Sequence, residues 1–201
     1  MKAVDSLGKI IAVTNQKGGV GKTTTSVNLS ACLAERGLKV LIVDIDPQGN
    51  ATSGLGQDLE RETSVYDVLA DLCTAEAAIV DTGVPNLSIM PTGIELAGAE
   101  IELVEEEDRE LLLMRALADL AGRYDYIIID CPPSLGLLTL NALTAADTVL
   151  IPIQCEYYAL EGVGRLAKTV RLMRKKLNPA LDIEGILLTM YDARTNLCAQ
   201  V

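Results

Sequence analysis

The sequence has 201 residues, of which 49% are hydrophobic, and this is enough for one domain with a core of its own. The formal net charge of −11 disfavours a generic polyanion binder, and the absence of histidine removes the Ser-His-Asp triad and the commonest metal ligand. Phe and Trp are also absent, so aromatic platforms for single-stranded nucleic acid are not expected.

Short apolar runs alternate with longer helical patterns along the chain. Strands are predicted at residues 9–15, 39–46, 86–91, 124–130, 148–154 and 183–190. Helices are predicted at residues 22–37, 108–123, 135–145 and 160–177, with short helical fragments between 47 and 85. The strand runs are almost continuously apolar, which is typical of strands buried on both faces of a parallel sheet. The order of elements predicts an α/β fold with a doubly wound, mostly parallel sheet flanked by helices.

A glycine-rich loop, "QKGGVGKTT" (16–24), stands between the first predicted strand and the first predicted helix. Gly18, Gly19 and Gly21 allow the backbone to turn and to bring N–H groups against phosphate oxygens. The N-terminus of the helix adds partial positive charge. Lys22 is expected to contact the β- and γ-phosphates, and Thr23 to coordinate Mg²⁺ through its hydroxyl.

Lys17 is the unusual residue of this loop. Gln16 stands where the usual phosphate loop has its first glycine, and a lysine follows at once. At the start of the loop, its side chain is expected to point away from the nucleotide of its own chain. It can therefore act on the phosphates of a second copy, as an arginine finger does. The alternative is a solvated surface lysine.

Aspartates follow two of the predicted strands. Asp44 and Asp46 stand in "VDIDPQGN", and Asp130 ends "YIIID". In parallel α/β sheets, ligands bind at the carboxyl ends of the strands. We expect Asp44 and Asp46 to leave opposite faces of their strand, one holding the water shell of Mg²⁺ and the other orienting the attacking water. Asp130 is expected on the Mg²⁺ side; the alternative for each is a turn or helix-capping role.

The motifs "KGGVGKTT", "VDIDPQGNATSGLG", "IIIDCPPSLGLLTLNAL" and "PIQCEYYALEG" together resemble the ParA/Soj family of chromosome-partitioning ATPases. This family has a deviant Walker A loop and is related to MinD, nitrogenase iron protein and arsenite-pump ATPases. The resemblance runs from about residue 9 to the end of the sequence. It implies a slow, switch-like, Mg²⁺-dependent ATPase.

The resemblance also implies roles for individual residues. Lys17 would contact nucleotide across an ATP-bound homodimer, and Asp46 would be the switch aspartate required for hydrolysis. Asp44 would lie near the metal, and Asp130 would be the second switch aspartate. The residues expected to wrap the phosphates of ATP are Lys17, Gly18, Gly19, Val20, Gly21, Lys22, Thr23 and Thr24. ATP-bound dimers of this family bind double-stranded DNA without sequence preference, and a ParB-type partner stimulates hydrolysis.

A basic helix is the candidate DNA surface. Residues 156–201 carry seven basic and five acidic side chains, whereas residues 1–155 carry ten basic and 23 acidic ones. The predicted helix 160–177 contributes Arg165, Lys168 and Arg171, and Arg194 is a further candidate by family position. Phosphate contacts from such a helix would be salt-dependent. The alternative is a solvated helix face.

The expected organisation is a single ATPase domain over residues 1–201, truncated at its C-terminus, because "YDARTNLCAQV" reads as the middle of a helix. No membrane-spanning run or signal peptide is recognised, so we expect a cytoplasmic, nucleoid-associated protein without a membrane partner. The alternatives are a MinD-like role and a metabolic or electron-transfer ATPase. Five scattered cysteines favour reduced, inert thiols, with Cys131 as the candidate for a cluster role.

Overall fold

The structure is a computed structural model that describes residues 8–120, 122–155, 159–192 and 194. Its strands are β1 (Lys9–Val13), β2 (Val40–Asp44), β3 (Val80–Asp81), β4 (Leu87–Met90), β5 (Tyr126–Asp130), β6 (Thr148–Gln154) and β7 (Asp182–Thr189). Its α-helices are α1 (Lys22–Glu35), α2 (Asn50–Gly54), α3 (Val65–Leu69), α4 (Ala75–Ala78), α5 (Ala99–Glu102), α6 (Leu112–Leu117), α7 (Leu137–Ala145) and α8 (Ala159–Lys176). Short 3₁₀ helices are η1 (Ile94–Ala97), η2 (Leu103–Glu105) and η3 (Arg109–Leu111).

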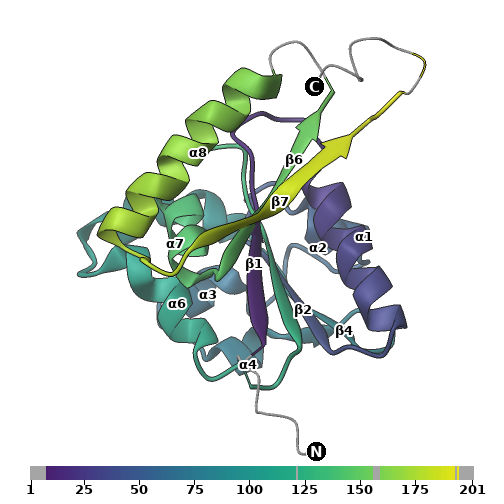
Figure 1. Cartoon of the computed structure of the whole chain (residues 1–201). Helices are drawn as coiled ribbons and strands as arrows, with labels where there is room; N and C mark the ends of the chain where they lie inside the picture. Colours follow the sequence, from purple (N-terminus) through teal and green to yellow (C-terminus); the bar gives the residue numbers. More distant parts are fainter. Residues whose placement is uncertain (1–7, 121, 156–158, 193, 195–201) are drawn as a thin grey trace, which may run out of the picture.

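The strands form one seven-stranded sheet in the order β3-β4-β2-β5-β1-β6-β7. Every neighbouring pair is parallel except β3–β4. Helices α1 and α2 lie on one side of this sheet, and α6, α7 and α8 lie on the other (Figure 1). The predicted doubly wound, mostly parallel α/β fold is confirmed.

The central strands are buried on both faces, as their apolar runs predict. In β2, Leu41 and Val43 belong to the core cluster under α3, α6, α7 and α8. The alternating residues Val40 and Ile42 belong to the second cluster, under α1 and α2. Successive side chains of a strand point to opposite faces, so in a strand covered on both sides every position is buried and favours an apolar residue.

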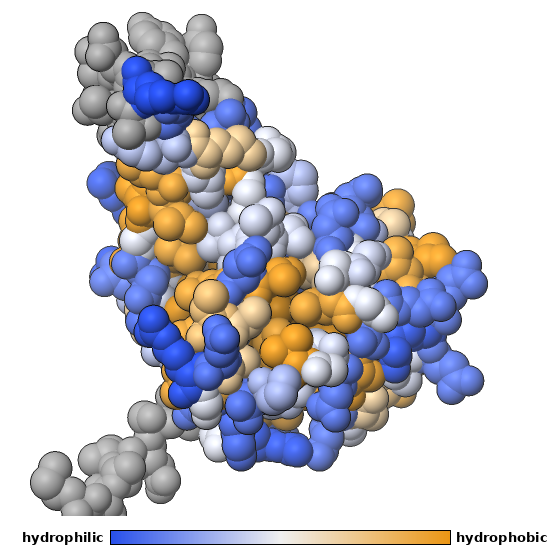
Figure 2. Space-filling model, turned by 90° about the vertical axis from the view of Figure 1, so that its right-hand side faces the viewer, coloured by the Kyte–Doolittle hydropathy of each residue, from blue (hydrophilic) through white to orange (hydrophobic). Residues whose placement is uncertain are grey.

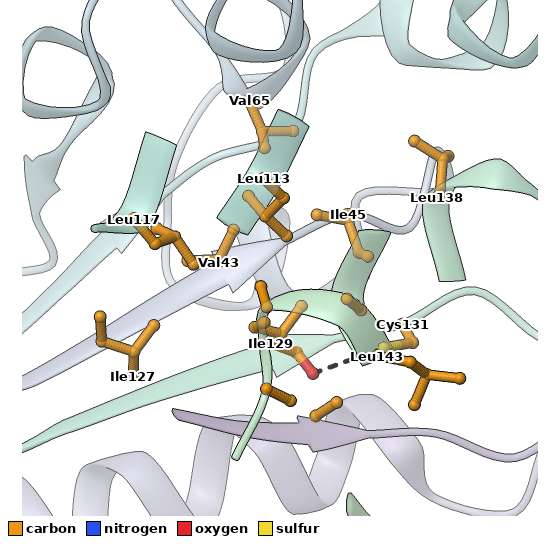
Figure 3. Close-up of a cluster of buried hydrophobic side chains, with 14 of the residues drawn as sticks. Val43, Ile45, Val65, Leu113, Leu117, Ile127, Ile129, Cys131, Leu138 and Leu143 are labelled. Atoms are coloured by element: carbon orange, nitrogen blue, oxygen red, sulfur yellow. Dashed lines mark hydrogen bonds between the residues drawn. The ribbon is translucent and has the colours of Figure 1, made fainter. Parts of the chain in front are cut away.

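The larger core cluster joins β2 and β5 to the helices above them (Figure 3). Ile127 and Ile129 of β5 lie beneath Leu113 of α6, and all three are fully buried. Cys131 is in the same cluster, where its Sγ lies 3.7 Å from the carbonyl oxygen of Ile129. Burial raises the pKa of this thiol well above its usual range, so Cys131 packs as a small apolar side chain.

The predicted helix 108–123 is wrong in its extent. The regular helix α6 covers only Leu112–Leu117, after the 3₁₀ helix η3. Beyond it, the backbone N–H of Leu120 donates to the carbonyl of Leu117, and that of Arg123 to Leu120. This three-residue spacing keeps Leu117 and Leu120 in the core, at 1% and 2% exposure, while the chain turns toward β5.

Two other parts of the chain differ from the sequence prediction. The two-residue strand β3 pairs antiparallel with β4 and was not predicted, because so short a strand has no detectable period. Tyr191 and Asp192 are not helical, so the helix expected at the end of the sequence does not begin there. Residues 193 and 195–201 lie outside the described residues.

The strand β7 is largely exposed. Ile186, Leu187 and Leu188 are 49%, 40% and 40% exposed, and apolar surface appears in this region on the left of Figure 2, below the grey atoms.

None of the described helices is both long and apolar enough to cross a membrane.

The core packing above leads to a stability prediction. Replacing fully buried Leu113 by Ala should lower the free energy of unfolding by about 3 kcal/mol, because it removes apolar burial and leaves a cavity beneath α6. Met114 is the next residue of the same helix and is 40% exposed, so Met114→Ala should cost less than about 1 kcal/mol. Chemical denaturation of both variants measures the difference; equal losses would contradict the assigned packing.

Candidate functional site

The candidate site lies where three central strands end. Asp44 is the last residue of β2 and pairs in register with Asp130, the last residue of β5. Asp130 pairs in register with Val13, where β1 ends and leads into the glycine loop (residues 16–21). Because these strands are parallel, all three ends reach the same edge of the sheet. The sheet therefore brings the loop and the two carboxylates together.

The glycine loop is held at its start and turns sharply at its end. The side chain of Asn15 donates to the carbonyl of Pro152 at 2.8 Å and accepts from the backbone N–H of Lys17 at 3.0 Å. Gly19 and Gly21 have φ values of 74° and 85°, which residues with a Cβ rarely adopt. Helix α1 then begins at Lys22, so its N-terminal N–H groups face the loop.

Lys22 is the charged residue at the centre of the site. It is only 7% exposed, and its Nζ donates to the carbonyl of Lys17 at 3.3 Å. Burial lowers the pKa of this ammonium, and the nearby carboxylates of Asp46 and Asp130 act in the opposite direction. The charge of Lys22 is therefore disfavoured by burial and partly stabilised by the neighbouring carboxylates.

Asp130 is fully buried beside this lysine. Its Oδ1 accepts a hydrogen bond from the Ser26 hydroxyl at 2.7 Å, and its Oδ2 is buried without a hydrogen-bond partner among the residues that the structure describes. Burial raises the pKa of its carboxyl to about 6, and hydrogen bonds from Ser26 and Thr23 and the charge of Lys22 oppose this rise. A buried carboxylate oxygen without a partner is unfavourable and is suited to a ligand that carries positive charge or donates a hydrogen bond.

Both carboxylate oxygens of Asp44 already accept hydrogen bonds within the protein. Its Oδ2 accepts from the backbone N–H and the hydroxyl of Thr52, at 2.8 and 2.7 Å, and its Oδ1 accepts from the N–H of Asp46 at 3.2 Å. Burial and the charge of Asp130 raise the pKa of the Asp44 carboxyl to about 7, against these hydrogen bonds. Asp44 thus fixes α2 to the end of β2.

Asp46 lies just beyond β2 and is 5% exposed. Its Oδ1 accepts from the N–H of Gln48 at 3.0 Å, and its charge acts on Lys22 and on Asp130. The expectation that Asp44 and Asp46 diverge to opposite faces is not met. Side chains two residues apart in a strand share a face, and here the strand already ends at Asp44. The charge of Asp46 acts on Asp130, and the charge of Asp130 acts on Asp44.

The turn after Asp46 is closely packed. Gly49 has φ 61°, and a Cβ built on it would lie 2.4 Å from Cδ2 of Leu59 and 2.9 Å from Cγ2 of Thr92. Both the backbone conformation and the neighbours therefore require glycine. The turn that follows Asp46 is in direct contact with the segment that follows β4.

The remaining predicted site residues occupy the outer side of the loop and α8. Lys17, Gly18, Gly19 and Thr24 are exposed, and Val20 is buried. On α8, Lys168 and Arg171 are exposed, whereas Leu166, Val170 and Met173 on the opposite face are buried against the sheet. Arg165 falls in α8, but its side chain lies outside the described residues. Arg194 is exposed and pairs with Asp192 at 2.7 Å.

Four functional residues were not predicted from the sequence. Asn15, Ser26, Thr52 and Thr189 each use a polar side chain to fix part of the site. Asn15 and Thr189 share a signal that could have identified them, since each is a polar residue at the carboxyl end of a buried or parallel strand. Ser26 lies one helical turn after Lys22, on the same face of α1.

The oxygen atoms available at this site fit a magnesium ion that binds together with a phosphate ligand. The described residues contain no group of three or more His, Cys, Asp or Glu side chains placed to hold a metal ion. Mg²⁺ usually keeps several waters and takes only one or two protein ligands beside substrate phosphates. The unpartnered oxygen of Asp130 and the neighbouring hydroxyl of Thr23 match that requirement.

The raised pKa of Asp130 leads to a prediction of stability against pH. Its carboxyl holds a proton up to about pH 6 in the fold, but only to about pH 4 in the unfolded chain, so stability falls as the pH rises between these values. Asp130→Asn removes this loss and should raise the free energy of unfolding by about 1–2 kcal/mol at pH 7.5. At pH 4.5, where Asp130 is mostly protonated, the effect should be small.

Denaturant unfolding at the two pH values measures this effect. Glu35→Gln, at the exposed end of α1, is the control and should change stability by less than about 0.5 kcal/mol at both values. An equal effect of Asp130→Asn at pH 4.5 and 7.5 would show that burial of the charged carboxylate is not its cause.

Comparison with known proteins gives a consistent family. A family model described as an AAA domain matches residues 8–183. The chain is 65% identical over 196 residues to the sporulation initiation inhibitor protein Soj of Bacillus subtilis. This match covers 97% of the present chain and 78% of that protein. It is 54% identical over 197 residues to the chromosome partitioning protein ParA of Myxococcus xanthus, covering 98% of this chain and 70% of that protein.

A solved structure from Mycobacterium smegmatis is also similar. It is named cobyrinic acid a,c-diamide synthase, contains an ATP analogue and magnesium, and matches with a TM-score of 0.92 at 47% identity. The match covers 96% of this chain and 79% of that one. Since relatives of high identity match almost the whole chain, the resemblance stated from the motifs is confirmed, and the chain belongs to the ParA/Soj family of chromosome-partitioning ATPases.

Proposed function

We propose that this partitioning ATPase works as an ATP-dependent homodimer that binds double-stranded DNA without sequence preference and releases it on hydrolysis. The observation that carries the proposal is the buried Lys22 at the N-terminus of α1, between a glycine loop and the carboxylates of Asp46 and Asp130. A desolvated ammonium beside free helical N–H groups is suited to a multiply charged phosphate ligand.

The loop binds the phosphates of ATP in this proposal. The backbone of residues 17–24 wraps them, and the glycine conformations at Gly19 and Gly21 allow the N–H groups to approach closely. Lys22 contacts the β- and γ-phosphates. The carbonyl of Lys17, which accepts from Lys22 at 3.3 Å, keeps the ammonium beside the loop before nucleotide arrives.

Thr23, Asp44 and Asp130 are the proposed magnesium-side residues, and they contribute in different ways. The Thr23 hydroxyl is the direct ligand, and Asp130 holds the water shell through its unpartnered Oδ2. Asp44 already accepts three hydrogen bonds, so its contribution is to position Asp46 and Thr52. Bound Mg²⁺ neutralises phosphate charge and orients the γ-phosphate.

Asp46 and Lys17 carry hydrolysis. Asp46 orients the attacking water, because it lies beside Lys22 at the end of the site where the γ-phosphate is expected. Lys17 is exposed at the start of the loop and supplies its charge to the nucleotide of the second copy. Hydrolysis is slow because full neutralisation of the phosphates needs both copies of the chain. The rate of hydrolysis therefore sets how long the ATP-bound dimer lasts.

The exposed face of α8 is the proposed DNA surface. Lys168 and Arg171 lie one turn apart on the face away from the core. Arg165 is added because it falls in the same helix, and Arg194 is added by family position. Arg194 pairs with Asp192, so it has to exchange that partner for a DNA phosphate. Dimerisation doubles the number of cations, which lets a net acidic protein bind DNA.

The same proposal includes a ParB-type partner that stimulates hydrolysis, a cytoplasmic and nucleoid-associated location, and no membrane partner. Residues 1–201 form one ATPase domain in this proposal, and the matches to the two relatives named above span 78% and 70% of their lengths. The family relationship supports the partner and the location, since both relatives named above are partition or sporulation regulators.

A second candidate is a metabolic ATPase, favoured by the name of the Mycobacterium smegmatis structure. Such an enzyme would use the same phosphate site to activate a small substrate. It needs neither exposed cations on α8 nor nucleotide-dependent binding to DNA. The DNA experiment below separates the two candidates.

The trans role of Lys17 can be tested by mixing two inactive variants. Lys17→Ala and Asp46→Ala should each lower ATP hydrolysis at least tenfold. A mixed dimer contains one site with an intact Asp46 and a Lys17 supplied by the other copy, so mixing should restore activity in that site. Phosphate release is measured over a range of mixing ratios at constant total protein.

The mixing result distinguishes two geometries. If Lys17 acts on its own nucleotide, each site of the mixed dimer lacks one essential group, and no activity returns. Asp46→Ala alone should still bind ATP and should accumulate as a dimer, which sedimentation velocity detects. Normal hydrolysis by Asp46→Ala would reject its assignment as the switch carboxylate.

DNA binding should depend on α8 and on salt. With ATP and Mg²⁺, the Lys168→Ala/Arg171→Ala variant should bind a random duplex at least tenfold more weakly than the parent chain. A dimer loses four cations, so the slope of log K against log salt should fall by about 3 to 4. The control Arg36→Ala/Lys39→Ala removes two exposed cations near the opposite end of the sheet and should not change the slope. Absence of ATP-dependent binding by the parent chain would favour the metabolic candidate.

A further inference from the structure

The last strand of the sheet contacts the glycine loop through one side chain. Thr189 ends β7, and its hydroxyl lies 2.8 Å from the carbonyl oxygen of Val20, although 169 residues separate the two. The same hydroxyl lies 3.0 Å from the carbonyl of Ile153 in β6, so its proton is shared between the two carbonyls. A Cβ built on Gly21 would lie 3.5 Å from Cγ2 of Thr189, which places this side chain against the loop.

The contact fixes the orientation of one peptide unit. The chain has no cis peptide bond among its described residues, so the carbonyl of Val20 and the N–H of Gly21 point in opposite directions. When Thr189 holds the carbonyl on the outer side of the loop, the N–H of Gly21 is turned to the inner side. The inner side is where the phosphates of ATP are proposed to bind.

Among the described residues, Thr189 is the hydrogen-bond donor that holds the carbonyl of this peptide unit. Rotation of a peptide plane changes ψ of the residue before it and φ of the residue after it. Gly21, at φ 85°, is the residue type that tolerates both signs of φ, so rotation costs little there. A rotated unit would present a carbonyl oxygen to the phosphates and repel them.

Two other carbonyls of the loop also have specific hydrogen-bond donors. The carbonyl of Lys17 accepts from Nζ of Lys22, and that of Gly21 accepts from the N–H and the hydroxyl of Thr25. These partners come from α1, directly after the loop. Of these three loop carbonyls, that of Val20 accepts from a side chain on a distant strand.

We propose that Thr189 is a positioning residue for nucleotide: it holds the Val20–Gly21 peptide with its N–H toward the phosphates, and so sets the affinity of the loop for ATP and ADP. This inference rests on the proposed nucleotide function of the loop. It also means that the placement of the edge strand β7 is transmitted to the phosphate-binding backbone.

The test removes the hydroxyl and keeps the shape of the side chain. Thr189→Val in the full chain should raise the Kd for Mg·ADP, measured by titration calorimetry, about five- to tenfold, as expected for loss of one hydrogen bond and a disordered peptide. Thr189→Ser keeps the hydroxyl and should restore the Kd to within about twofold. In steady-state hydrolysis, Thr189→Val should raise KM with little change in kcat, because the loop holds the phosphates equally in the ground and transition states.

A matched control separates positioning from general stability. The hydroxyl of buried Thr144 donates to the carbonyl of Leu140 at 2.8 Å within α7, away from the loop. Thr144→Val should lower the melting temperature about as much as Thr189→Val but leave the Kd unchanged. Thr189→Ala provides the same comparison if the valine variant does not fold.

The possible failures are distinct. An unchanged Kd and KM in Thr189→Val or Thr189→Ala overturns the inference while leaving the nucleotide function intact. A rise in Kd that Thr189→Ser does not reverse also overturns it, because the hydroxyl would then not be responsible. If the parent chain itself does not bind Mg·ADP or Mg·ATP, the proposed function fails before any variant is compared, and the inference fails with it.

Discussion

The burial of one ammonium beside the carboxylates of Asp46 and Asp130 is the interaction on which the site depends. Lys22 is almost completely removed from water, and the carboxyl groups of Asp44 and Asp130 are fully buried at the same edge of the sheet. Burial raises the pKa values of Asp44 and Asp130, and the charge of a neighbouring aspartate adds to the rise in each case. The fold therefore holds an arrangement that is unfavourable by itself and that a divalent cation bound with phosphate would correct.

The parallel sheet makes this arrangement possible. Strands β1, β2 and β5 are adjacent or one position apart, run in the same direction and are covered by helices on both faces. Their apolar residues fill both core clusters, so polar groups are placed where the strands end. The same geometry gathers Asn15 and Thr189 from β1 and β7, which explains why residues far apart in sequence fix the two sides of one loop.

The strand–loop–helix unit and the strand-terminal aspartates could be predicted because each has a local pattern. The loop has its glycines and "GKT", and Asp44 and Asp130 follow unbroken apolar runs. The shortened α6 could not be predicted, because the helical period of the sequence continues beyond the ends of the helix. In the structure, the side chain of Asn141 in α7 binds the backbone at Arg109 and Leu113. After α6, the chain continues in turns with hydrogen bonds between residues three apart.

The part that Thr189 and Thr52 play also escaped prediction, because a hydroxyl that binds a distant group leaves no period or spacing in the sequence. The orientation of Asp46 was missed for a different reason. Side chains two residues apart in a strand share a face, so the expected divergence from Asp44 did not follow even from the predicted strand 39–46, which also extended two residues too far.

Gly49 has a consequence for how the site can move. The turn after Asp46 meets Leu59 and Thr92 with no room for even a methyl group, and Thr92 in turn donates its N–H to the Thr52 hydroxyl that binds Asp44. Three separate stretches of chain are thus interlocked behind the carboxylates. Because closely packed groups move together, a displacement of the turn after Asp46 would also displace Leu59 and the Thr92–Thr52 contact behind Asp44.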